Sequence, residues 1–190
     1  MSSPVDLLLS RRSMKFVQSP GPNDQELDLI LQAAMRAPDH GQLRPWRFRV
    51  LQGDAVTRWA DVAIEACREA GEPLTPQKEA STRQWLGNVP LLLAVGCFID
   101  HANTKIPEQE RVLATGAAVT NILNAAHMLG YSAYWSTGLG TYIEEVGELL
   151  GFDALEYNFM GYVSIGTPLR ELPERGRPDY RDFTSEWTGN

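Results

Sequence analysis

The chain has 190 residues, a length that suits one folded domain with a substantial core. Its formal net charge of −7 argues against a general nucleic-acid surface, because such surfaces bind phosphate mainly through lysine and arginine. No apolar run approaches the roughly 20 residues of a membrane span and no secretory leader pattern opens the sequence, so we expect a cytoplasmic protein without a membrane or nucleic-acid partner.

The sequence predicts a series of short helices and strands. Apolar residues at helical spacing, capping residues and proline or glycine breaks define the helices, and apolar runs define the strands. In chain order, we expect helices over 5–9, from Asn23 or Asp24 to 37, from an Asp54 cap to about 68, and over 76–86, 108–129 and 143–150, with strands over 48–51, 89–99, 131–136 and 157–165. The polar helix over 76–86 is interpreted as a flap.

Two of these elements indicate how the chain packs. The strand over 89–99 is almost continuously apolar, which is typical of a central strand covered on both faces. The helix over 108–129 has Gly116, Ala117 and Ala118 near its middle, which favours close packing, either within the chain or against a second subunit.

Residues 168–190 differ in character from the rest of the chain. They are rich in charge and proline, yet Tyr180, Phe183 and Trp187 are spaced through them. The aromatic residues favour an extended arm that packs on another surface, of which a partner subunit is one example, and disorder is the alternative. No internal repeat or linker divides the chain, so residues 1–190 are predicted to form a single domain that ends in this arm.

The segment 37–46 concentrates polar side chains between a predicted helix and a predicted strand. It contains Asp39, His40, Gln42, Arg44 and Trp46, framed by two prolines. Polar loops held between rigid elements are where binding chemistry tends to collect. The sequence therefore predicts a binding role for this loop.

Two basic clusters stand near the ends of the chain. They are Arg11, Arg12, Ser13 and Lys15 after the first predicted helix, and Arg175 and Arg177 near the C-terminus. Arginine suits phosphate because its planar fork donates two parallel hydrogen bonds. Solvated surface charge is the alternative explanation for each cluster.

The sequence offers no side-chain nucleophile. It contains no glycine-rich phosphate loop and no Gly-x-Ser-x-Gly segment, and its histidines show no metal-ligand spacing. Cys67 and Cys97 lie in apolar or helical contexts far apart in the sequence, so we expect buried, reduced thiols. If the protein is an enzyme, a bound cofactor should supply the chemistry.

The order of these segments resembles the FMN-dependent nitroreductase family from about residue 5 to residue 180. The segments are an Arg-Arg-Ser after the first helix, Met35-Arg36-Ala37-Pro38, Pro45-Trp46, a long apolar strand, an alanine-rich helix, Trp135-Ser136-Thr137-Gly138 and Gly166-Thr167-Pro168. The sequence is most similar to a short bacterial subgroup with Ala-Pro-Asp-His, which stands here at 37–40. The resemblance implies an α+β fold, with a mainly antiparallel sheet flanked by helices and an extended C-terminal arm.

The resemblance also implies a homodimer with FMN in a groove at the subunit interface. Arg11, Arg12 and Ser13 would hold the phosphate and ribityl end of the flavin, and Lys15 would lie near its pyrimidine edge. Arg175 and Arg177 would have a similar phosphate or ribityl role.

Two further segments are implied to contact the flavin. Arg36 and His40 match subgroup positions that reach the cofactor from the neighbouring chain. Trp135, Ser136 and Thr137 match a segment that lines the flavin at a strand end, where Gly138 would permit close approach.

The activity implied is that of an NAD(P)H-dependent oxidoreductase. It would reduce nitroaromatics, quinones or similar small molecules by a ping-pong mechanism, with NAD(P)H and the acceptor using the same open face of the flavin in turn. The alternatives are a flavin-binding store or sensor without significant turnover, and a family relative with other flavin chemistry. The sequence does not indicate NADH or NADPH as the reductant, nor the physiological acceptor.

Some residues depart from the family pattern. Most members carry serine, asparagine and glutamine where this chain has Asp39, Gln42 and Arg44. Arg44 adds a positive charge that would either pair with Asp39 or favour an anionic acceptor. Ser136 stands where some members of the subgroup carry arginine, and the substrate lid of longer members is reduced to about residues 71–87.

Overall fold

The computed structural model describes residues 3–170 and 176–189. Its α-helices are α1 (Pro4–Ser10), α2 (Asp24–Ala34), α3 (Asp54–Glu69), α4 (Pro76–Leu86), α5 (Glu108–Met128) and α6 (Glu144–Leu149). Its strands are β1 (Val17–Gln18), β2 (Trp46–Gln52), β3 (Leu91–Phe98), β4 (Ser132–Ser136) and β5 (Tyr157–Pro168), and two 3-10 turns are η1 (His40–Gln42) and η2 (Tyr180–Phe183).

The five strands form one antiparallel sheet in which β5 is the organising strand. One edge of β5 pairs with β3, and β2 follows at the outside of the sheet. The other edge pairs first with β4, from Ser136↔Tyr162 to Ser132↔Gly166, and then with β1. The predicted mainly antiparallel sheet flanked by helices is therefore confirmed.

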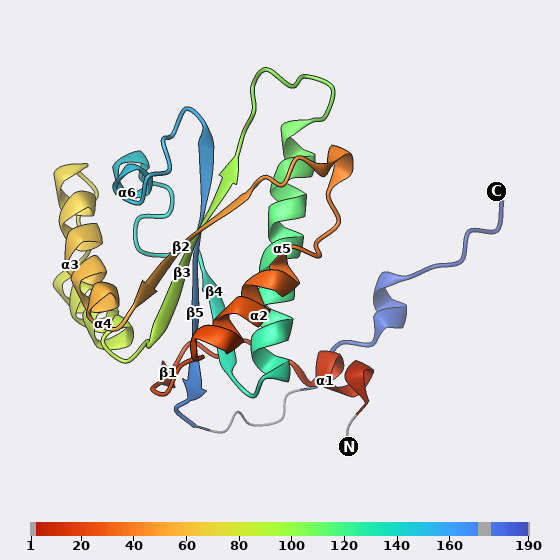
Figure 1. The fold of residues 1–190 in the computed structure, drawn as a ribbon, viewed down its shortest axis with the longest axis horizontal. Coiled ribbons are helices and arrows are strands. Elements are labelled where there is room, and N and C mark those ends of the chain that lie inside the picture. Colours follow the sequence, from red (N-terminus) through yellow and green to blue (C-terminus); the bar gives the residue numbers. More distant parts are fainter. Residues whose placement is uncertain (1–2, 171–175, 190) are drawn as a thin grey trace.

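Helices cover both faces of this sheet. In Figure 1, α2 and α5 lie on one side of the sheet, while α3, α4 and α6 lie on the other. The central strand β3 serves both cores, because Leu92 and Ala94 belong to the cluster under α3 and α4, while Leu91 and Leu93 belong to the cluster under α2 and α5. This confirms the predicted strand covered on both faces, and each buried leucine contributes about 1.5–3 kcal/mol of transfer free energy.

The structure corrects some details of the predicted elements. Gly53, with a φ of 54°, is the N-cap of α3, and Asp54 is the first helical residue. The carboxylate of Asp54 still lies at the positive end of the helix dipole, which is why acidic residues are favoured there. Strand β1 was not predicted, because two residues are too few to show a periodicity, and β5 continues three residues past Ile165.

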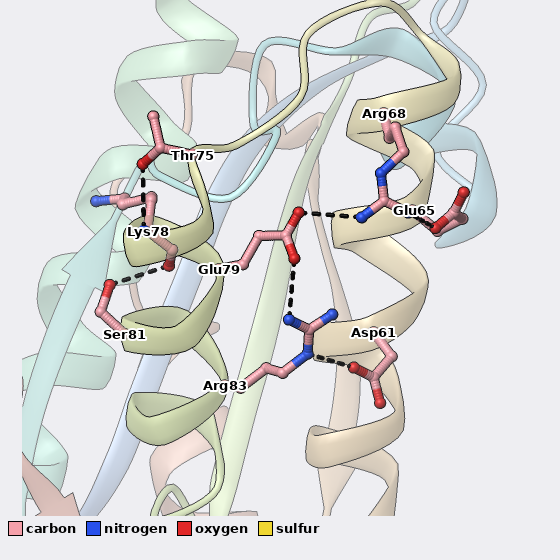
Figure 2. A network of polar contacts seen from close by, with 8 residues as sticks. All are labelled: Asp61, Glu65, Arg68, Thr75, Lys78, Glu79, Ser81 and Arg83. Carbon is pink, nitrogen blue, oxygen red and sulfur yellow. Dashed lines mark hydrogen bonds and ion pairs between the residues drawn. The ribbon is translucent and has the colours of Figure 1, made fainter.

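Helix α4 is packed against α3 and is not a detached flap. Its inner face buries Thr82, Trp85 and Leu86. On its outer side, Glu79 accepts hydrogen bonds from Arg68 of α3 at 3.0 Å and from Arg83 at 3.1 Å, and Figure 2 shows these contacts. Arg83 also reaches Asp61 of α3 at 2.8 Å, and Arg68 contacts Glu65. The 71–87 segment is thus part of the folded body of the protein.

The described part of the C-terminal arm, residues 176–189, is exposed along its whole length. It passes near α1 and then leads away from the sheet (Figure 1). Tyr180, Phe183 and Trp187 expose 66%, 74% and 88% of their surface. The expected extended arm is present, and its aromatic side chains have no cover within the described chain.

Cys67 and Cys97 are both buried and free, as predicted for reduced thiols. Across residues 3–170 and 176–189, no group of three or more metal-ligating side chains comes together. Nor does any helix in that part of the chain combine the length and apolarity needed to cross a bilayer.

Candidate functional site

The chain that leaves α1 runs beside β4. Ser13 forms a parallel bridge with Ala133, and the backbone N–H of Met14 donates to the Ala133 carbonyl at 3.1 Å. Met14 is buried, which fixes the segment against the core. The predicted residues Arg11, Arg12 and Ser13 are therefore held next to the strand that leads to the predicted Trp135–Thr137 segment.

Arg11 has the hydrogen-bonding capacity expected of an anion-binding residue. Its Nη1 atom is buried and has no hydrogen-bond partner among the residues that the structure describes. Its backbone carbonyl accepts a hydrogen bond from Nη2 of Arg177 at 2.7 Å, which brings the C-terminal arm to the same corner. A buried guanidinium N–H without a partner is costly, and a phosphate oxygen would satisfy it with a charge-assisted hydrogen bond.

His127 adds a group that sequence reasoning missed. Its Nε2 lies 2.9 Å from Oγ of Ser10, the residue before Arg11, although the two are 117 positions apart in the chain. Burial and the positive charge of Arg11 lower the pKa of His127 below its ordinary value of 6.5. This shift favours the neutral imidazole, so the arginines are the groups that bring positive charge to this corner.

Lys15 is held by α4. Its backbone carbonyl accepts a hydrogen bond from Nε1 of Trp85 at 3.0 Å, and its Nζ lies 4.6 Å from the centroid of the Trp85 ring. Burial and the charge of Lys78 lower the pKa of Lys15 below 10.5. The packed 71–87 segment thus positions the cation for which the family resemblance implies a place near the flavin ring.

The predicted residues at the end of β4 lie where the backbone of β4 and the backbone of β5 approach each other closely. Nε1 of Trp135 donates to the Met160 carbonyl at 2.8 Å, and Oγ of Ser136 accepts from the Gly138 N–H at 3.2 Å. Gly161 has a φ of 92°, and a Cβ there would lie 2.3 Å from the Ser136 carbonyl oxygen. Only glycine at 161 lets the backbone of β5 approach Ser136 this closely. Thr137, which follows Ser136, is exposed.

Arg36 and His40 do not lie with the residues of the segment after α1 and of β4. Both are exposed in the segment after α2, and Nδ1 of His40 is 2.6 Å from Oε2 of Glu110. Glu110 stands near the start of α5 and His127 near its end. These two residues are 17 positions apart, about 25 Å at the usual helical rise.

Within one chain, the predicted site residues thus fall into two groups, one on the segment after α1 together with β4, and the other on the segment after α2 (Figure 1). The first comprises Arg11, Arg12, Ser13, Lys15, Trp135, Ser136, Thr137 and Arg177, and the second comprises Arg36 and His40. The remaining predicted residue, Arg175, lies outside the described residues. Ser10, Trp85, Glu110 and His127 were missed because no sequence signal links residues this far apart.

Solved structures with the same architecture belong to nitroreductase-like proteins. The nitroreductase-like family protein of Bacillus cereus superposes with a TM-score of 0.82 at 19% identity, covering 100% of this chain and 98% of that one. The "putative nitroreductase in complex with fmn" of Desulfovibrio desulfuricans gives a TM-score of 0.75 at 22% identity, with 98% of each chain covered. The protein therefore has a nitroreductase-like fold.

Sequence comparison identifies the family. The family model described as Nitroreductase family matches residues 8–167. The "Putative NAD(P)H nitroreductase YdjA" of Escherichia coli (strain K12) is 30% identical over 182 residues, covering 95% of this chain and 97% of the relative. A "Putative NAD(P)H nitroreductase" of Haemophilus influenzae is 30% identical over 186 residues with the same coverage. The chain belongs to the nitroreductase family and is an oxidoreductase.

Proposed function

We propose that the protein is an FMN-dependent NAD(P)H oxidoreductase that reduces nitroaromatics, quinones or similar small acceptors by a ping-pong mechanism. The observation that carries the proposal is the buried Nη1 of Arg11, which has no hydrogen-bond partner among the described residues and lies near Ser13 and Arg177 at the start of β4. Family membership and the FMN named for the Desulfovibrio desulfuricans structure support it. A cytoplasmic location stays a prediction from the sequence.

In this proposal, Arg11, Arg12, Ser13 and Arg177 hold the phosphate and ribityl end of FMN. The Arg11 guanidinium fits a phosphate because it has an unsatisfied buried N–H and a positive charge. We extend the same role to Arg175, which is close to Arg177 in sequence. Trp135, Ser136 and Thr137 line the flavin where β4 ends.

A homodimer follows from the position of the second group. His40 contacts Glu110, which lies about 25 Å along α5 from His127 at the Arg11 corner, and Arg36 belongs to the same segment as His40, so in one chain they would flank a different place. A second copy would bring its own Arg36 and His40 to this flavin. The uncovered Tyr180, Phe183 and Trp187 of the arm supply apolar surface for such a contact.

When bound, FMN would supply the two-electron redox chemistry that links NAD(P)H to the acceptor. The chain's own contribution is electrostatic. Lys15, held by Trp85, would place a positive charge at the pyrimidine edge, where the reduced ring gains negative charge. No side chain of the protein has to act as a nucleophile.

The decisive experiment mixes the FMN-loaded protein with NADH or NADPH in a stopped-flow instrument. Bleaching of the flavin absorbance, followed by reoxidation with 4-nitrobenzamide or a quinone, would support the oxidoreductase. Flavin that stays oxidised with both reductants would support the alternative of a flavin store or sensor. A colourless protein that FMN does not reconstitute would refute both.

The dimer has its own test. Light scattering should give the mass of two chains, and truncation after residue 175 should weaken the dimer because it removes the three aromatic residues. A stable, active monomer would contradict a site shared between subunits.

A further inference from the structure

A pocket of about 470 Å³ lies in the loop between α2 and β2, on the side of the molecule where Arg36 and His40 stand. Its lining residues are Met35, Ala37, Asp39, Gln42, Arg44 and Trp46. The three residues that depart from the family pattern, Asp39, Gln42 and Arg44, are all among them. The pocket therefore gathers the residues at which this chain departs from the pattern of most family members.

The backbone of this loop is strained at two of those residues. Gln42 and Arg44 have φ values of 55° and 48°, in the left-handed region that non-glycine residues rarely adopt. Hydrogen bonds hold the backbone of Arg44 at both its N–H and its carbonyl group. Its N–H donates to Oδ2 of Asp39 at 2.6 Å, and its carbonyl accepts from Nη1 of Arg47 at 2.7 Å. Strain held in place by two side chains indicates that the direction of the Arg44 side chain matters.

The same contacts decide between two roles for Arg44. The carboxylate of Asp39 binds the backbone of Arg44, and no acidic side chain of the described residues forms an ion pair with the Arg44 guanidinium. Arg44 is exposed at the pocket. Its planar fork is therefore available for an anion, and a carboxylate is the group it matches best among organic acceptors.

The wall of the pocket suits a flat ring. Nε1 of the buried Trp46 donates to Sδ of Met35 at 3.2 Å, and Met35 exposes 48% of its surface. Thioether sulfur and aromatic carbon are polarizable surfaces that pack well against aromatic ligands. A ring against Met35, with a negative group at Arg44, would use both features of the pocket.

We propose that Arg44 selects electron acceptors that carry a carboxylate on an aromatic ring. The inference rests on the proposed function, in which Arg36 and His40 from the same segment face the flavin. It assigns aromatic carboxylates to the site as a substrate class. It also gives a chemical reason why this chain has arginine at position 44, where most family members have glutamine.

The test compares two acceptors of the same size and reducible group, 4-nitrobenzoate and 4-nitrobenzamide. The FMN-loaded protein should have a higher kcat/KM for the anion. Arg44→Gln should lower the ratio of the two kcat/KM values about tenfold or more, the size expected for loss of one charge-assisted hydrogen bond. Arg44→Lys should keep part of the preference, and Arg58→Gln, on the exposed face of α3, should leave the ratio unchanged.

A binding measurement keeps the proposal independent of turnover. Calorimetric titration of the oxidised, FMN-loaded protein with benzoate and benzamide should show tighter benzoate binding in the wild type and not in Arg44→Gln. Equal affinities in the wild type would overturn the proposal whether or not the variants fold. An effect of Arg44→Gln on the KM for NADPH alone, with the acceptor ratio unchanged, would also overturn it and assign Arg44 to a nucleotide phosphate.

Failure of the proposed function gives a different result. A protein whose flavin neither NADH nor NADPH reduces would refute the oxidoreductase, and the benzoate titration would still decide the role of Arg44. A protein that reduces both equally well in wild type and Arg44→Gln would refute the selectivity alone.

Discussion

Replacing Arg11 with alanine should weaken FMN binding by about 10- to 150-fold. The structure gives the reason, because Nη1 of Arg11 is buried and has no hydrogen-bond partner in the described chain. A hydrogen bond to a charged group contributes about 1.5–3 kcal/mol, and each 1.4 kcal/mol is about a factor of ten in affinity. The substitution leaves the backbone carbonyl of Arg11, which accepts the hydrogen bond from Arg177, in place.

The assay titrates apoprotein with FMN and separately with riboflavin, which lacks the phosphate, and follows flavin fluorescence. Arg11→Ala should reduce the affinity for FMN and leave that for riboflavin nearly unchanged. Arg58→Ala, which removes an exposed arginine from α3, is the matched control for the loss of one positive charge. Equal losses for both ligands, or no loss for either, would refute a phosphate contact at Arg11.

Three further predictions test other parts of the structure. Burial and the charge of Lys78 lower the pKa of Lys15, so Lys78→Gln should raise that pKa and slow acetylation of Lys15 at pH 9, measured by mass spectrometry; an unchanged rate would refute the coupling. The two arginines that Glu79 contacts lower its pKa below 4.5, so Glu79→Gln should destabilise the protein to denaturant above pH 4.5, and the difference from wild type should shrink as the pH falls further. A difference that grows in acid would contradict this sign. Burial raises the pKa values of Cys67 and Cys97, so a thiol reagent should modify neither in the folded protein and both in guanidinium; rapid labelling of the native state would show that the packing is wrong.

Local signals in the sequence predicted most of the fold. The bounds of α4 follow from Thr75 as cap, proline at the first helical position and glycine after Leu86, and all of these act within a few residues. The two-sided burial of β3 follows from its unbroken apolar run. The cap of α3 was misassigned because Gly53 and Asp54 are both acceptable at that position, and only the backbone conformation distinguishes them.

The candidate site was predicted only in part, and through resemblance. Arg11, Arg12 and Ser13 form a visible cluster in the sequence. A solvated surface and a phosphate site would show the same cluster, so the sequence alone does not distinguish them. The packing of α4 was not predicted, because a polar helix gives no sign that Trp85 points inward to Lys15.

By itself, the sequence determined the six α-helices, the strands β2 to β5 and the family, because caps, breaks and apolar periodicity act over short distances along the chain. Only the tertiary structure decided which distant residues meet: Ser10 with His127, His40 with Glu110, and Arg11 with Arg177. It also decided that Asp39 binds the backbone of Arg44 and leaves the guanidinium available. Such contacts depend on how helices pack across a sheet, and the energy that forms them comes from the buried core and not from the residues that touch.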